Sequence, residues 1–83
     1  MKEEDLSKAI KLKEQLDSER ELLKFANSYD VNLRVNLEER SETGRIRNMN
    51  YLLGDNFIKE LNAIVISKIE KRINDLLEKL EKL

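Results

Sequence analysis

Apolar residues follow helical spacing in the first and last thirds of the chain, and alternate with polar residues between them. Over residues 3–27 the apolar positions are three or four apart and fall on one face of a helix: Leu6, Ala9, Ile10, Leu12, Leu16, Leu23 and Ala26. Over residues 55–82 and just beyond, the same spacing gives Phe57, Ile58, Leu61, Ile64, Val65, Ile69, Ile73, Leu76, Leu80 and Leu83. The pattern therefore predicts two long amphipathic helices.

Residues 31–53 have the two-residue period of a β-hairpin. The apolar residues Val31, Leu33, Val35 and Leu37 alternate with Asn32, Arg34, Asn36 and Glu38. A three-residue turn over residues 42–44, with Gly44 in the left-handed conformation, sets Leu37 opposite Met49 and Glu39 opposite Arg47. In this register Leu33, Val35 and Leu37 share a face with Met49, Tyr51 and Leu53. A two-residue turn would set Val35 and Leu37 against asparagines, so the three-residue turn is preferred.

These elements predict an α+β fold, with one helix–hairpin–helix domain over residues 1–83: a long helix, a two-stranded antiparallel hairpin and a long C-terminal helix. An isolated two-stranded hairpin is only marginally stable. The last helix would be about 40 Å long, more than a compact domain of this size needs. Ile66 and Leu77 also widen its stripe beyond what one partner helix covers. We therefore expect a homo-oligomer in which helices pack across protomers as in a coiled coil.

Two charged residues, Glu19 and Arg20, interrupt the first stripe between Leu16 and Leu23. In one interpretation the pair extends to solvent from the edge of a packed face. In the other it makes a polar contact that fixes the register of an oligomer interface.

Composition removes several kinds of chemistry. The chain has no cysteine and no histidine, so disulfides, thiolate metal sites and the commonest general base are absent. Its serines therefore have no histidine partner, and Gly44 and Gly54 are isolated, which excludes a phosphate-binding loop. We expect a protein that is not an enzyme and needs no cofactor or metal.

Charge and hydropathy bear on location. The net charge of −1 gives no overall attraction to nucleic acid or to an anionic membrane. The longest wholly apolar run covers residues 63–66, and the acidic start of the chain does not resemble a signal peptide. We expect a cytoplasmic protein that does not contact a membrane.

Arginine and asparagine concentrate in the predicted hairpin. Residues 31–53 hold four of the six arginines, four of the eight asparagines and no lysine. A guanidinium group suits phosphates and carboxylates, an amide can read base edges or hydroxyls, and a tyrosine ring can stack on a base. The candidate ligand-binding residues are Arg34, Asn36, Arg45, Arg47, Asn48, Asn50 and Tyr51. Arg47 and Tyr51 lie on the face opposite Arg34, so a site that uses all of them needs more than one protomer; the alternative is an ordinary solvated hairpin.

Three hypotheses for function follow from these residues. The first is a non-catalytic binding protein that captures a small anionic, nucleotide-like ligand in an oligomeric pocket. The second is a small inhibitor or adaptor that binds a protein through the hairpin or the C-terminal helix. The third is nucleic-acid binding by the Arg/Asn hairpin, and the near-neutral net charge counts against it.

The chain consists of LSKAIKLKEQLDSERELLKFANS, then VNLRVNLEERSETGRIRNMN, then a helix that ends in RINDLLEKLEKL. With its lack of cysteine and histidine, this layout resembles small phage-encoded proteins of low-GC Gram-positive hosts. The resemblance implies stoichiometric binding rather than catalysis, to counter host defence by sequestering a nucleotide signal or by blocking a defence protein. It assigns no role to any single residue.

Overall fold

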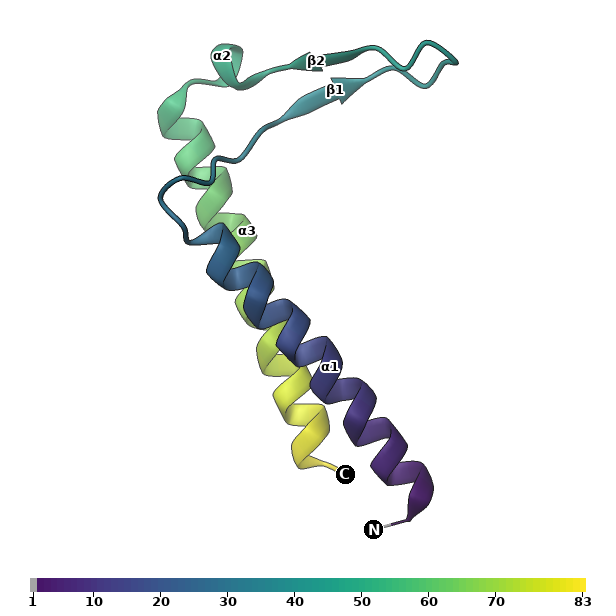
Figure 1. The fold of residues 1–83 in the computed structure, drawn as a ribbon. Helices are drawn as coiled ribbons and strands as arrows, with labels where there is room; N and C mark the ends of the chain where they lie inside the picture. Colours follow the sequence, from purple (N-terminus) through teal and green to yellow (C-terminus); the bar gives the residue numbers. More distant parts are fainter. Residues whose placement is uncertain (1) are drawn as a thin grey trace.

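The computed structural model describes residues 2–83 and has the helix–hairpin–helix order that the sequence predicts (Figure 1). Helix α1 spans Glu3–Ala26 and helix α3 spans Asp55–Glu81. Between them lie strand β1 (Asn36–Glu38), strand β2 (Ile46–Asn48) and the short helix α2 (Asn50–Leu53). The predicted α+β class is confirmed.

Helices α1 and α3 lie side by side and antiparallel, and their facing residues form a narrow seam (Figure 1). On α1 the less exposed positions alternate three and four apart: Asp5, Ala9, Leu12, Leu16, Glu19, Leu23 and Ala26. On α3 the corresponding positions are Asn62, Ile66, Ile69, Ile73, Leu76 and Leu80. Within residues 2–83 only Leu16 and Ile69 are fully buried, at 4% and 6% exposed. One seam between two helices thus supplies nearly all of the core.

The hairpin is shorter than predicted and its register differs. The paired residues are Asn36 with Asn48, Leu37 with Arg47, and Glu38 with Ile46. The prediction that Leu37 lies opposite Met49 is therefore wrong by two residues. A shift of two leaves each strand side chain on its predicted face, because side chains alternate with a period of two.

A longer turn accounts for the change in register. The Glu39 N–H donates to the Arg45 carbonyl at 2.8 Å, so the turn covers residues 40–44 rather than 42–44. Gly44 has φ +52°, which confirms its predicted left-handed conformation, and its N–H donates to the Ser41 carbonyl at 3.0 Å. The hairpin therefore closes two residues farther from its tip than a three-residue turn would allow.

The predicted second strand ends early, at Asn48, and residues 50–53 turn into α2. The Leu53 N–H donates to the Met49 carbonyl at 3.1 Å, and the Gly54 N–H donates to the Asn50 carbonyl at 3.0 Å. Tyr51 and Leu53 are thus helical, and the prediction that they continue a strand is wrong. Gly54, with φ +87°, then joins α2 to α3.

The hairpin projects sideways from one end of the helical pair (Figure 1). We call residues 33–50 the arm. The start of α1 and the end of α3 lie together at the opposite end of the molecule. The radius of gyration is 17.7 Å, whereas a compact chain of this length would have about 12 Å. The molecule is therefore elongated, with extents of 53 × 33 × 19 Å.

Candidate functional site

Two asparagine side chains hold the base of the arm. The Asn50 Oδ1 accepts a hydrogen bond from the Val35 N–H at 2.8 Å, and its Nδ2 donates to the Leu33 carbonyl at 2.7 Å. The Asn48 Nδ2 lies 3.3 Å from the Val35 carbonyl, which also accepts from the Met49 N–H at 2.7 Å. The Asn50 side-chain amide thus replaces the backbone hydrogen bonds that a longer β2 would make to residues before β1. We call this arrangement the asparagine lock (Asn48, Asn50 and the backbone of Leu33 and Val35).

The lock engages two of the candidate ligand-binding residues within the chain itself. Asn48 and Asn50 are half-buried, and Asn48 Oδ1 also accepts from the Asn50 N–H at 3.2 Å. Asn36 is exposed and accepts from Asn48 Nδ2 at 3.1 Å. The amide groups that the sequence assigned to a ligand therefore bond to one another and to the arm backbone.

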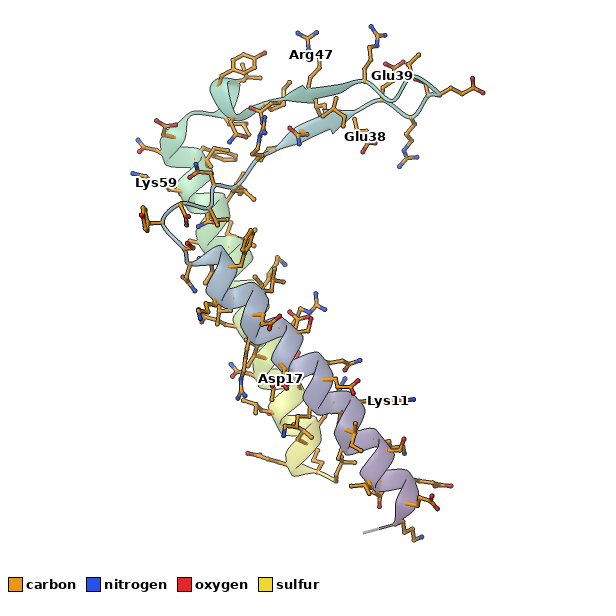
Figure 2. All side chains as sticks on the ribbon, in the orientation of Figure 1. Lys11, Asp17, Glu38, Glu39, Arg47 and Lys59 are labelled. Atoms are coloured by element: carbon orange, nitrogen blue, oxygen red, sulfur yellow. The ribbon has the colours of Figure 1, made fainter. Side chains whose placement is uncertain are left out.

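The arginines of the arm divide between its two faces. Arg45 Nε donates to Glu39 Oε2 at 2.8 Å, so Arg45 rather than Arg47 forms the cross-strand pair predicted for Glu39. Such an exposed pair contributes about 0–1 kcal/mol. Arg47 and Glu38 point to opposite sides of the arm (Figure 2). The alternation of side chains puts Arg45 and Arg47 on one face and Arg34 on the other.

Apolar and charged side chains share the outer part of the arm. Leu37 and Ile46 are 63% and 61% exposed, although both lie in strands. An open hollow of about 630 Å³ is lined by Leu37, Glu38, Glu39, Arg45, Ile46 and Arg47. Each strand of a two-stranded sheet also has one unpaired edge. The seventh candidate residue, Tyr51, lies outside this hollow in α2 and is 76% exposed.

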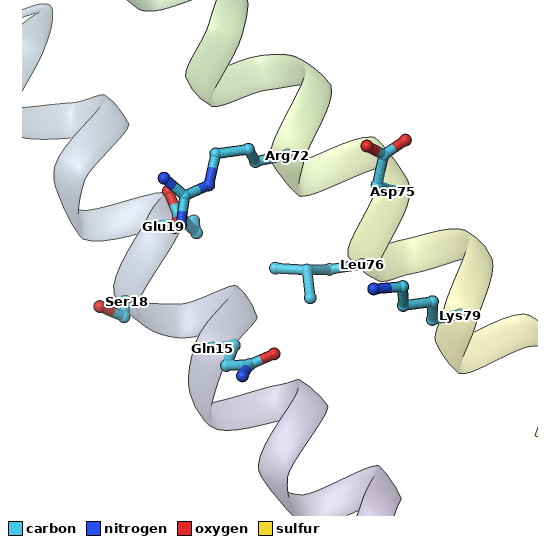
Figure 3. Close-up of a pocket in the computed structure, with 7 residues that line it drawn as sticks. All are labelled: Gln15, Ser18, Glu19, Arg72, Asp75, Leu76 and Lys79. Carbon is cyan, nitrogen blue, oxygen red and sulfur yellow. The ribbon is translucent and has the colours of Figure 1, made fainter.

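A second hollow, of about 370 Å³, lies between α1 and α3 (Figure 3). Its centre is an ion pair in which Arg72 Nη2 donates to Glu19 Oε1 at 2.6 Å. The Glu19 side chain is only 12% exposed, and its other oxygen is buried without a partner among the described residues. Glu19 thus makes its polar contact within one chain. Arg72 was not among the predicted site residues, although its position three residues after Ile69 places it beside the helical stripe.

The described residues contain neither a cluster of metal ligands nor a helix suited to cross a membrane. Among residues 2–83, no three acidic side chains gather closely enough to hold a metal ion. Neither long helix in that range combines the length and the apolar character that a membrane crossing requires.

Comparisons with protein-family models, with curated proteins and with solved structures found no match for this chain. Its function is accordingly inferred from the residues and geometry described above.

Proposed function

We propose that this protein is a non-catalytic, stoichiometric binding protein that captures a partner protein on its arm. The observation that carries the proposal is that the arm is fixed at its base and uncovered along its length. The asparagine lock holds the base, while Leu37 and Ile46 remain more than half exposed. The hairpin has three residue pairs, and an isolated hairpin of that size is only marginally stable in water. Because the chain nevertheless holds this hairpin away from the helices, we take it as a surface for contact with a partner.

The chemistry of the arm suits a protein surface. Leu37 and Ile46 supply one apolar anchor on each face of the arm, because Leu37 is paired with Arg47 and Ile46 with Glu38. Side chains of both charges lie beside these anchors: Glu38, Glu39, Arg45 and Arg47. Apolar anchors within a polar rim are typical of protein–protein interfaces. The unpaired edges of β1 and β2 can also accept an added strand from the partner. The arm has four arginines and three glutamates, a net charge of only +1, which gives little of the phosphate attraction that dominates nucleic-acid binding.

Capture of a small anionic ligand is the second candidate, and the hollow beside Arg45 and Arg47 is the observation that favours it. Arg34 lies on the other face, so a pocket that contains all three arginines needs a second protomer. Asn48 and Asn50 are engaged in the lock, and Arg45 is paired with Glu39. Fewer donors are therefore free for a ligand, which is why a partner protein is ranked first.

In this proposal the protein acts in the cytoplasm as a homo-oligomer, and its partner is a host defence protein. The support for that setting is the resemblance of the layout to small phage-encoded proteins. The helices would provide the contact between protomers, and the arm would provide the contact with the partner.

Site-specific crosslinking in cells of the source organism tests the proposal. A photoreactive phenylalanine derivative is introduced in place of Leu37 on the arm or, as a control, in place of the exposed Lys71 on α3. We expect one protein to be crosslinked in high yield from position 37 and not from position 71. The double variant Leu37→Ser/Ile46→Ser should abolish capture and leave the helical circular dichroism signal unchanged.

Equal crosslinking from both positions, or capture that survives the double substitution, would contradict binding by the arm. Native mass spectrometry of the purified protein distinguishes the second candidate. A small adduct that is present in the original protein and lost in Arg47→Ala would favour ligand capture instead.

A further inference from the structure

The helical pair leaves more surface uncovered than a chain of this size normally has. The accessible surface of the whole chain is 7443 Å², whereas a compact protein of 9.8 kDa exposes about 5,200 Å². Part of the excess belongs to the arm. Another part comes from apolar side chains of α1 and α3 that are 36–61% exposed: Leu22, Phe25, Phe57, Ile64 and Val65. Within residues 2–83 these side chains are therefore only partly covered.

These side chains gather on one side of the helical pair. On α3 they form a stripe with Leu61, because positions four, seven and eight residues after Phe57 share a face of the helix. On α1, Leu22 and Phe25 are three residues apart and also share a face. We call the set the phenylalanine face (Leu22, Phe25, Phe57, Leu61, Ile64 and Val65).

The ion pair between Glu19 and Arg72 shows how the two stripes align. Leu22 lies one helical turn from Glu19 toward the arm, and Val65 lies two turns from Arg72 in the same direction. Because the helices are antiparallel and the ion pair bridges one side of the seam, both stripes flank that same side. The phenylalanine face therefore extends from the ion pair toward the end of the molecule that carries the arm.

We infer that a second copy of this chain covers the phenylalanine face, so that two helical pairs pack as a four-helix bundle. A standard interface takes about 800 Å² from each partner. The chain exposes about 2,200 Å² more than a compact protein of its mass, which exceeds the roughly 800 Å² that each partner of such an interface contributes.

Two further observations select a second copy as the occupant. A layer of two antiparallel helices with apolar stripes completes a core when it meets another such layer, and a two-fold axis makes one patch complementary to itself. The net charge of −1 means that two copies meet with little repulsion.

This contact rests on the homo-oligomer of the proposed function and specifies its interface. It is separate from the binding by the arm, because none of the residues of the phenylalanine face belongs to residues 33–50. A dimer formed in this way carries two arms. If the partner also has two binding sites, both arms can engage at once and avidity exceeds the affinity of one arm.

Analytical ultracentrifugation tests the inference. The double variant Phe25→Gln/Ile64→Gln places two good helix formers on the phenylalanine face. The matched control is Leu6→Gln/Ile10→Gln, which changes side chains of similar exposure, 54% and 52%, near the far end of α1. We expect the original protein and the control to sediment at twice 9.8 kDa in the micromolar range. The variant of the phenylalanine face should dissociate at least about 100-fold more readily.

A mass of 9.8 kDa for the original protein would overturn the inference, as would a dimer that survives the Phe25→Gln/Ile64→Gln change. Loss of the dimer in the control alone would also overturn it, because the contact would then lie near the start of α1. Circular dichroism shows whether each variant keeps its helices. If the double variant loses them, Phe57→Gln, a single change in the first turn of α3, provides the same test.

Discussion

Asn50 bonds with both halves of its amide to the backbone that precedes β1, and this one side chain determines where the arm begins. An asparagine amide has a carbonyl and an N–H₂ group, so it can accept and donate in the same way as a peptide unit. Its bonds to the Val35 N–H and the Leu33 carbonyl satisfy groups that β2 no longer reaches. The chain can then leave the sheet and enter α2 while those backbone groups keep their hydrogen bonds.

The asparagine lock predicts that substitutions of Asn50 and Asn36 differ in their effect on stability. Asn50→Ala should lower the free energy of unfolding by about 1–3 kcal/mol, because it leaves two backbone groups in a half-buried position without partners. It should also accelerate hydrogen exchange of the Val35 amide, since that N–H loses its acceptor. Asn36→Ala, which removes one exposed acceptor, is the matched control and should change both quantities little. Equal effects of the two substitutions in urea unfolding and exchange would contradict the lock.

At the residue scale, the sequence indicated where the unusual asparagines lie but not what their side chains bind. Asparagine is disfavoured in strands, and its accumulation at residues 48 and 50 correctly marked an unusual place. The conflict with strand propensity arises from bonds between side chains and backbone, and residue type alone does not indicate whether an amide will bond to its own chain or to a ligand. The pairing of Glu19 with Arg72 was hidden for a similar reason, because it depends on the alignment of the two helices.

At the scale of elements, the junction between α2 and α3 depends on one residue. Gly54 has φ +87° and ψ 154°, a region of backbone conformation that is nearly restricted to glycine. No atom lies within 4 Å of the position that a Cβ would take there. A side chain at this position would therefore meet a conformational cost and no clash.

Gly54→Ala should accordingly destabilise the protein by about 1–3 kcal/mol. Gly44→Ala, at the left-handed position of the hairpin turn, should cost about 1 kcal/mol, because alanine enters that region less unfavourably. Thermal unfolding of both variants beside the original protein measures the difference. A larger loss at Gly44 than at Gly54 would show that the turn, rather than the junction, sets the stability.

The long elements were the most predictable part of the fold. A helical stripe sustained over more than twenty residues leaves few alternatives, and α1 and α3 begin and end close to the predicted positions. The hairpin was predicted as an element, with the correct faces and the wrong register. Alternation fixes which face a side chain takes, whereas register also depends on turn length and on the amides of Asn48 and Asn50. Neither of these leaves a periodic signal.

At the scale of the whole molecule, the shape follows from how little the arm packs against the helices. The helical pair gives the long axis and the arm projects across it, which accounts for extents of 53 Å and 33 Å in the two larger directions (Figure 1). The sequence predicted that the helices are longer than a compact domain needs. It did not predict the direction of the arm, because that direction is set by the junction at Gly54 and by the lock.

Small-angle X-ray scattering of the monomeric Phe25→Gln/Ile64→Gln variant tests this shape. We expect a radius of gyration close to 17.7 Å, because removing the second copy leaves the arm extended from the helical pair. A value clearly below 17.7 Å would mean that the arm folds back onto the helices in solution. The asparagine lock would then not determine the orientation of the arm.

The asparagine lock has a consequence for how the tip of the arm can vary. Its bonds to the first strand segment all end on backbone atoms of Leu33 and Val35, apart from one contact with Asn36. Backbone atoms are the same whatever side chain a residue carries, so the lock places almost no demand on the identity of residues 37–46. Apart from Gly44, whose left-handed conformation the turn requires, that stretch can change its sequence while the lock stays in place. Under the proposed function, the protein would be a scaffold on which the surface that contacts the partner can be exchanged.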